Sequence, residues 1–276
     1  MTYSHATRRT GFLLAALLLA LAACKGEDKT AAPAQAEART DANPWPQVTW
    51  PLPDDPAMEK RITELMAGMT VEEKVGQLVQ GDIASITPDD VRKYRLGSIL
   101  AGGNSDPGGR YDAKPAEWLA LADAFYAASM DTSTGGKAIP VLFGIDAVHG
   151  QSNIVGATLF PHNIGLGAAR NPDLVRRIGE ITALETRATG MEWAFAPTVA
   201  VPQDDRWGRT YEGYSESPEV VASYAGAVVE GLQGKVGSPT FLDGRHVIAS
   251  VKHFLGDGGT TDGKDQGDTK ISEADL

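Results

Sequence analysis

An apolar run near the end of the chain stops at two side chains that rarely occur inside a protein. Residues 247–251 are mostly β-branched and apolar, which is typical of a strand buried on both faces of a parallel sheet. Lys252 and His253 follow directly, and then a Gly-rich loop at 256–259. Because lysine is almost never buried without a partner, we expect this strand to open into a polar site. In α/β barrels, functional groups lie at such carboxyl ends of strands.

Four more apolar runs alternate with helical patterns along the chain. We expect strands at 78–80, 96–100, 139–145 and 193–201, and helices at 56–66, from 70, 116–130, 171–190 and 217–234. Strands that alternate with helices predict βαβ units and a parallel sheet. Five strands are too few to close an eightfold barrel, which usually takes about 250 residues. The predicted fold is therefore α/β, an incomplete (β/α)8 TIM-type barrel with about five βα units over residues 56–276.

Local signals predict where the helices begin and which faces they bury. Asn171-Pro172 and Ser217-Pro218 are typical helix starts, and Thr70-Val-Glu-Glu73 fits a capping box. In one helix we expect Leu119, Ala122, Phe125 and Tyr126 to point inward. In another, apolar residues recur at helical spacing, namely Leu174, Ile178, Ile181 and Leu184.

The amino terminus has the three parts of a secretory signal. Arg8-Arg9 precede an uncharged apolar run at 12–23 that is too short to span a bilayer. The run ends in Leu21-Ala-Ala-Cys24, which resembles a bacterial lipobox and implies cleavage before Cys24 and lipidation there. We therefore expect a lipoprotein-type signal peptide at 1–23, a linker or tether at 24–55, and export to the periplasm or cell envelope with a lipid anchor in a membrane. An ordinary signal peptide with a chance cysteine is the alternative.

The charge balance of the chain limits its partners. The formal net charge is −11, whereas phosphate binding requires clustered Lys and Arg, so nucleic acid is not expected as a partner. Nothing in the sequence points to a metal or to an organic cofactor.

Polar residues follow the third and fourth predicted strands. Asp146 comes directly after 139–145 and would accept hydrogen bonds from vicinal hydroxyls, with a helix cap or a structural ion pair as the alternative. Arg209 offers a planar fork of donors that suits hydroxyls or a carboxylate. Trp207 is interpreted as a stacking face for a sugar or as packing beneath its loop, and Arg206 as the partner of Asp204 or Asp205. His149, near Asp146, is interpreted as structural.

Adjacent residues of a regular strand point to opposite faces, so Lys252 and His253 would not reach one ligand from such a strand. We therefore predict an irregularity at 252–254, either a bulge or a cis peptide. The loop that follows is close to a phosphate-binding loop at Gly258–Lys264, but Asp265 stands where Ser or Thr should be. Its aspartates do not fit the EF-hand spacing either.

Several motifs together resemble glycoside hydrolase family 3, in its exo-β-glucanase and β-glucosidase branch. They are Gly144-Ile-Asp-Ala-Val-His-Gly150, Gly156-Ala-Thr-Leu-Phe-Pro-His162, Ala196-Pro197, Asp205-Arg-Trp-Gly-Arg209, Tyr214-Ser-Glu216 and Lys252-His-Phe-Leu-Gly-Asp-Gly-Gly259. The resemblance implies a (β/α)8 barrel followed by a second α/β domain. It also implies that Asp146, Arg209, Lys252 and His253 hold the terminal non-reducing glucose of a β-glucan or β-glucoside oligosaccharide.

The resemblance also implies which residues this chain lacks. The family nucleophile is an Asp in a Ser-Asp-Trp type motif, and the acid/base Glu lies later, so both are expected beyond Leu276 and no catalytic residue is assigned within 1–276. The N-acetylglucosaminidase branch has a histidine where this chain has Asp257, which favours the glucanase branch. We therefore expect retaining hydrolysis of β-glucosides by the complete enzyme and none by this fragment. The alternatives are a non-catalytic carbohydrate-binding lipoprotein and, less favoured, a phosphate-loop nucleotide hydrolase.

Overall fold

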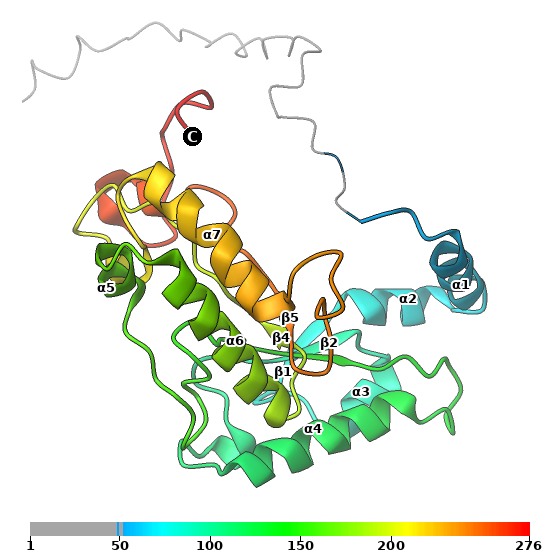
Figure 1. The fold of residues 1–276 in the computed structure, drawn as a ribbon. Helices are drawn as coiled ribbons and strands as arrows, with labels where there is room; N and C mark the ends of the chain where they lie inside the picture. The colour runs from blue at the N-terminus through cyan, green and yellow to red at the C-terminus, as the bar shows by residue number, and fades with distance from the viewer. Residues whose placement is uncertain (1–48, 50–51) are drawn as a thin grey trace, which may run out of the picture. The chain divides into compact units, whose positions relative to one another are not determined.

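Five parallel strands form one sheet in the computed structural model, which describes residue 49 and residues 52–276. The strands are β1 (Gln80–Asp82), β2 (Ser98–Ala101), β3 (Leu142–Ile145), β4 (Trp193–Ala194) and β5 (Ile248–Ala249). Each strand pairs with the next one in sequence, and helices connect them (Figure 1). Within the described residues β1 and β5 remain the two edges, so the sheet does not close. This confirms the predicted α/β class with about five βα units.

Most helices begin at a polar cap followed by proline. α1 (Pro56–Ala67), α3 (Pro88–Tyr94), α6 (Pro172–Ala188) and α7 (Pro218–Gln233) all start in this way. The side chain before each proline accepts a hydrogen bond from the first turn, and proline lacks the N–H that would otherwise be unpaired there. The predicted capping box at Thr70 begins α2 (Val71–Leu78). The remaining α-helices of the described part are α4 (Pro115–Met130) and α5 (Asn163–Ala168).

The predicted amino-terminal features lie outside the described residues. These are the signal peptide at 1–23, Cys24 and most of the tether at 24–55. Within residues 52–276, each helix is too short or too polar to cross a membrane.

Helices α6 and α7 lie side by side because glycines meet at their contact (Figure 1). A Cβ on Gly231 would lie 2.2 Å from the carbonyl oxygen of Arg176, and one on Gly179 would lie 3.0 Å from the Cα of Gly231. So close an approach favours small side chains, and the buried face of α6 consists of Val175, Gly179, Thr182, Ala183 and Thr186. Of the apolar residues that recur at helical spacing in α6, Leu174, Ile181 and Leu184 are therefore exposed.

Helix α4 buries a neighbouring stripe of its surface rather than the predicted one. Ala122 and Phe125 are buried, as predicted, and Trp118 is buried as well. Leu119 and Tyr126 are 42% and 53% exposed, so those two predictions were wrong. The large Trp118 and Phe125 rings, seven residues apart, direct the buried stripe toward the sheet.

The strands are shorter than predicted, and β5 is less covered. The strand expected at 78–80 begins instead at Gln80, because α2 continues to Leu78. The strand expected at 193–201 is interrupted near Pro197, which has no N–H for the ladder. The residues of β5 are half-buried and Val251 is 54% exposed, so burial on both faces was wrong. Among the described residues, β5 pairs with a neighbouring strand on one side only.

Candidate active site

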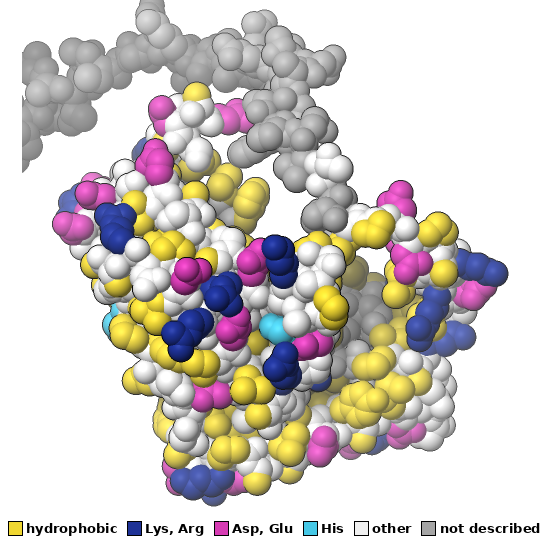
Figure 2. All heavy atoms as spheres, viewed as in Figure 1, with side chains coloured by type: hydrophobic (Ala, Val, Ile, Leu, Met, Phe, Trp, Pro, Cys, Tyr) yellow, Lys and Arg dark blue, Asp and Glu magenta, His cyan; other side chains and the backbone are white. Residues whose placement is uncertain are grey.

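Side chains from the carboxyl ends of β3 and β5 meet in a close ion pair. Asp146 follows β3 directly, and Lys252 lies three residues after β5. The Lys252 Nζ donates to Asp146 Oδ1 at 2.7 Å, with the lysine side chain 17% exposed and the aspartate 37%. Asp146 therefore keeps an accessible carboxylate edge, and Lys252 keeps donor capacity beyond this bond. Figure 2 shows acidic and basic side chains interspersed on one face of the protein, among exposed apolar ones.

A second ion pair forms within the loop after β4. Arg209 donates from Nε and Nη2 to the two carboxylate oxygens of Glu212, at 2.8 and 2.9 Å. Glu212 ends the 3₁₀ turn η2 (Thr210–Glu212) and is buried. Burial raises the pKa of Glu212, but the hydrogen bonds and charge of Arg209 outweigh burial and leave that pKa below its usual value. Glu212 is therefore an anion at neutral pH.

His253 joins the loop after β5 to Arg209. Its Nδ1 lies 2.7 Å from Asp257 Oδ2, and its Nε2 lies 3.3 Å from Arg209 Nη2. Because a carboxylate only accepts hydrogen bonds, this geometry places the proton on Nδ1 and makes Nε2 an acceptor from Arg209. Hydrogen bonds thus run from Asp257 through His253 and Arg209 to Glu212.

The backbone at Lys252 departs from a regular strand, as predicted. The Lys252–His253 peptide bond is cis, and so is Phe254–Leu255. Lys252 still pairs with the loop after β4, because its N–H donates to the Pro197 carbonyl at 2.9 Å and its carbonyl accepts from the Val199 N–H at 2.8 Å.

The two ion pairs belong to one polar cluster, with Glu212 between them. The four predicted residues form two contacts, Asp146 with Lys252 and Arg209 with His253. The charges of Arg209 and Lys252 both lower the pKa of Glu212. Thr198, which pairs with Lys252 in an isolated bridge, donates to Glu212 Oε2 at 3.4 Å. The segments that follow β3, β4 and β5 therefore bring together four of the side chains that the sequence proposed for substrate, Asp146, Arg209, Lys252 and His253.

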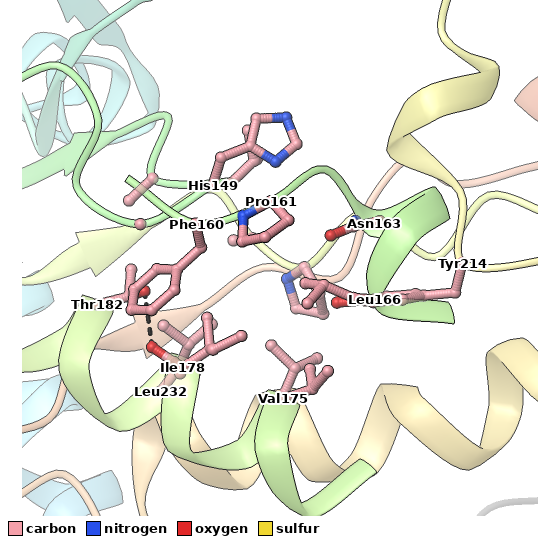
Figure 3. Close-up of a pocket in the computed structure, with 17 residues that line it drawn as sticks. His149, Phe160, Pro161, Asn163, Leu166, Val175, Ile178, Thr182, Tyr214 and Leu232 are labelled. Atoms are coloured by element: carbon pink, nitrogen blue, oxygen red, sulfur yellow. Dashed lines mark hydrogen bonds between the residues drawn. The ribbon is translucent and has the colours of Figure 1, made fainter. Parts of the chain in front are cut away.

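His149 lies beside this cluster among aromatic neighbours. Its Nε2 lies 3.1 Å from His162 Nδ1, and the Tyr211 and His162 ring centroids are 4.6 Å apart. Burial lowers the pKa of His149, and the nearby His162 and Lys252 lower it further against the opposing charge of Glu212. His149 also lines a small pocket over α6, together with Asn163 (Figure 3).

Trp207 and Arg206, which lie in the loop after β4, make structural contacts within the protein. Trp207 is 2% exposed and donates from Nε1 to Asp265 Oδ1 at 2.9 Å, so it packs beneath its loop and offers no stacking face. Arg206 pairs with Asp204, whose pKa its hydrogen bonds lower to about 2.

The loops after β4 and β5 are interlocked. The Gln203 N–H donates to the Gly258 carbonyl at 2.8 Å, and the Trp207–Asp265 bond joins the same two loops. Only glycine fits at position 258, because a Cβ there would lie 2.4 Å from the Val201 carbonyl oxygen. The loop that carries Arg209 and the loop that carries His253 are thus held against each other.

The loop after β5 does not have the shape that a phosphate-binding loop requires. It forms two short 3₁₀ turns, Asp257–Gly259 and Thr261–Gly263, and no α-helix follows them within the described residues. A phosphate-binding loop opens into a helix whose N-terminus holds the phosphates. Within residues 52–276, no group of three or more acidic, histidine or cysteine side chains is placed to hold a metal ion.

The fold and the site together define an open barrel of the TIM type, with charged, partly buried groups at the carboxyl edge of its sheet. The sequence profile of the glycosyl hydrolase family 3 N-terminal domain matches residues 70–276. This chain therefore belongs to glycosyl hydrolase family 3.

Individual relatives agree with the family match. The lysosomal beta glucosidase of Dictyostelium discoideum is 31% identical over 239 residues, which cover 80% of this chain and 28% of that protein. The periplasmic beta-glucosidase of Salmonella typhimurium is 31% identical over 220 residues, covering 80% of this chain and 26% of that protein. The crystal structure of an exo-1,3/1,4-beta-glucanase from a Pseudoalteromonas species is 56% identical, with a TM-score of 0.78 over 83% of this chain and 29% of that one. The chain thus spans less than a third of each.

Glu212 belongs to the cluster, although the sequence motifs assigned it no role. The available signal was its spacing from Arg209, since a carboxylate three residues after an arginine can pair with it in a single helical turn. That spacing is common on protein surfaces, and burial of the pair is what distinguishes it here.

Proposed function

We propose that this chain supplies the sugar-binding part of a retaining β-glucosidase or exo-β-glucanase. The observation that carries the proposal is the cluster in which Lys252 contacts Asp146 and His253 contacts Arg209. Such a cluster presents ionised donors and acceptors at one place, which suits the adjacent hydroxyl groups of a terminal glucose. Family membership and the β-glucosidase and exo-β-glucanase names of the relatives support the same reaction class.

In this proposal each of the four residues has a separate task. Asp146 accepts from two neighbouring sugar hydroxyls, while Lys252 and Arg209 donate to hydroxyl oxygens. His253 lies beside Arg209 and contributes to the same grip. Bonds of this kind accelerate the reaction to the extent that they strengthen as the oxocarbenium-like transition state develops.

The reacting carboxylates are proposed to lie outside residues 1–276. A retaining mechanism needs a nucleophile and an acid/base, with their carboxyl groups about 5–5.5 Å apart. No cluster residue is assigned either role, because Asp146 is bonded to Lys252 and Glu212 is buried against Arg209. The short span of the chain relative to its relatives supports this division.

The division of labour predicts a clear contrast in activity. We expect the full-length enzyme to hydrolyse an aryl β-glucoside and purified 1–276 to show no turnover above the no-enzyme rate, as followed by release of the coloured phenol. Turnover by 1–276 would contradict the placement of the reacting carboxylates. A full-length protein that binds glucose without hydrolysing glucosides would instead support the carbohydrate-binding lipoprotein. Exposed apolar side chains near the open edge of β1, among them Val71 and Val75, count against a free-standing binding module.

We also propose export with a lipid anchor at Cys24, supported by the lipobox-like Leu21–Cys24 and by relatives named as periplasmic. Replacing Cys24 with serine is expected to move the protein from the membrane fraction to the soluble fraction and to abolish labelling by a radioactive fatty acid. The control is Ser4→Ala, which leaves the lipobox intact. Unchanged membrane association and labelling of the C24S protein would contradict the anchor.

A further inference from the structure

Glu212 is the most buried carboxylate of the site, and the proposed reaction leaves it without a task. It is 6% exposed, yet its oxygens accept from Arg209 Nε, Arg209 Nη2 and the Thr198 hydroxyl. A buried ion pair of this kind is often no more stabilising than apolar packing, so its presence calls for a reason other than stability.

The bond pattern determines which edge of Arg209 remains available. Glu212 takes the Nε–H and one hydrogen of Nη2, and His253 Nε2 takes the other hydrogen of Nη2. Arginine has five N–H donors in one plane, so the two on Nη1 remain. Nη1 has no hydrogen-bond partner among the described residues, and the Arg209 side chain is 27% exposed. The guanidinium is thus held along one edge and open at its other end.

Glu212 is itself held firmly enough to act as a support. Its backbone N–H donates to the Arg209 carbonyl at 2.9 Å, and its carbonyl accepts from Asn163 Nδ2 at 2.7 Å. Asn163 begins α5 and lines the pocket drawn in Figure 3. The support for Arg209 therefore extends from the loop after β4 into the helical layer.

We propose that Glu212 is a positioning residue, which holds the Arg209 guanidinium so that Nη1 donates to a hydroxyl of the bound sugar. This inference rests on the proposed sugar-binding function and adds the donor atom and the group that orients it. Without Glu212, the guanidinium would turn toward one of two other carboxylates, Asp257 or Asp265. The charges of both already act on Arg209. The sugar would then lose a charge-assisted bond.

The test uses Glu212→Gln in the full-length enzyme, which keeps the size of the side chain and removes its charge. We expect the KM for an aryl β-glucoside and the Kd for glucose to rise about 10- to 100-fold, as for loss of a hydrogen bond to a charged group. The matched control is Glu180→Gln on α6, which removes a carboxylate from an exposed pair with Arg176 and should change neither constant. In an Arg209→Ala background, Glu212→Gln should raise the KM and the Kd by less than about twofold further, because the effects of two residues that act through the same contact are not additive.

The outcomes separate this inference from the proposed function. Absence of glucose binding by the unmodified enzyme would contradict the proposed function. Normal glucose binding by the unmodified enzyme with an unchanged KM and Kd for E212Q, or full additivity with R209A, would overturn the role of Glu212 alone.

A measurement on the unmodified enzyme covers the case in which E212Q does not fold. In nitrogen-detected spectra of the arginine side chains, the Arg209 Nε–H should be as rigid as backbone, with an order parameter of about 0.85 without sugar. Added glucose should shift the Nη1 signals more than the Nε signal. A mobile Nε–H, or a shift confined to Nε, would overturn the proposal.

Discussion

Replacing Lys252 with alanine is expected to lower kcat/KM of the full-length enzyme for β-glucosides by about 100-fold or more. Two effects act together. The sugar loses a cationic donor, and Asp146 loses its counter-ion at a site where the lysine side chain is only 17% exposed. An unpaired carboxylate there would bind water or turn away from the sugar. The measurement is initial-rate kinetics on an aryl β-glucoside, after thermal unfolding has shown that the variant is folded.

The control for Lys252 is a lysine that also pairs with a carboxylate but lies on the surface. Lys60 on α1 is 77% exposed and lies 3.8 Å from Glu64. Exposed pairs of this kind contribute at most about 1 kcal/mol, so Lys60→Ala should leave kcat/KM unchanged. A folded K252A enzyme with kcat/KM close to the unmodified value would remove Lys252 from the proposed site.

Adding a single methyl group to α5 is expected to destabilise the barrel strongly. A Cβ on Gly167 would lie 1.7 Å from the Tyr214 carbonyl oxygen. Tyr214 is buried and its ring stacks on that of Tyr224, so its backbone has little room to move. We expect Gly167→Ala to lower the free energy of unfolding by about 3 kcal/mol and the Tm of the barrel by about 6–12 °C.

The same helix provides the matched control. A Cβ on Gly165 would have no atom within 4 Å, and the residue lies in α5. Gly165→Ala should therefore leave stability unchanged or raise it by up to about 1 kcal/mol, since alanine favours the helical state. The measurement is thermal unfolding by circular dichroism. Equal Tm values for the two variants would show that α5 can move away from Tyr214.

The sequence was most informative where one local signal determines the structure. Proline after a polar cap located α6 and α7, and the apolar run that ends at Lys252 predicted the irregular backbone there. It was least informative about helix faces. Leu174 and Ile181 have the spacing of a buried stripe, but the contact between Gly179 and Gly231 turns smaller residues inward. That contact depends on a second helix, which periodicity within one helix does not describe.

The four residues that the sequence proposed for the site contact one another in two pairs, but not all of their other partners were predicted. Asp146, Arg209, Lys252 and His253 each follow a strand or carry a distinctive charge, so their types pointed to binding. Glu212 follows no strand and belongs to a segment crowded with charges. To predict a role for Glu212, one would need to know that Arg206 donates to Asp204, whereas Arg209 donates to Glu212. Such choices depend on loop geometry that local patterns do not determine.

The interlocked loops after β4 and β5 have a consequence for engineering. Because Gln203 is bonded to Gly258 and Trp207 to Asp265, neither loop has a shape of its own that another protein could adopt separately. In a chimera that takes only one of these loops from a relative, the introduced loop would pack against the other loop of this protein, whose sequence does not match it. Attempts to alter substrate preference by loop exchange should therefore replace the loops after β4 and β5 together.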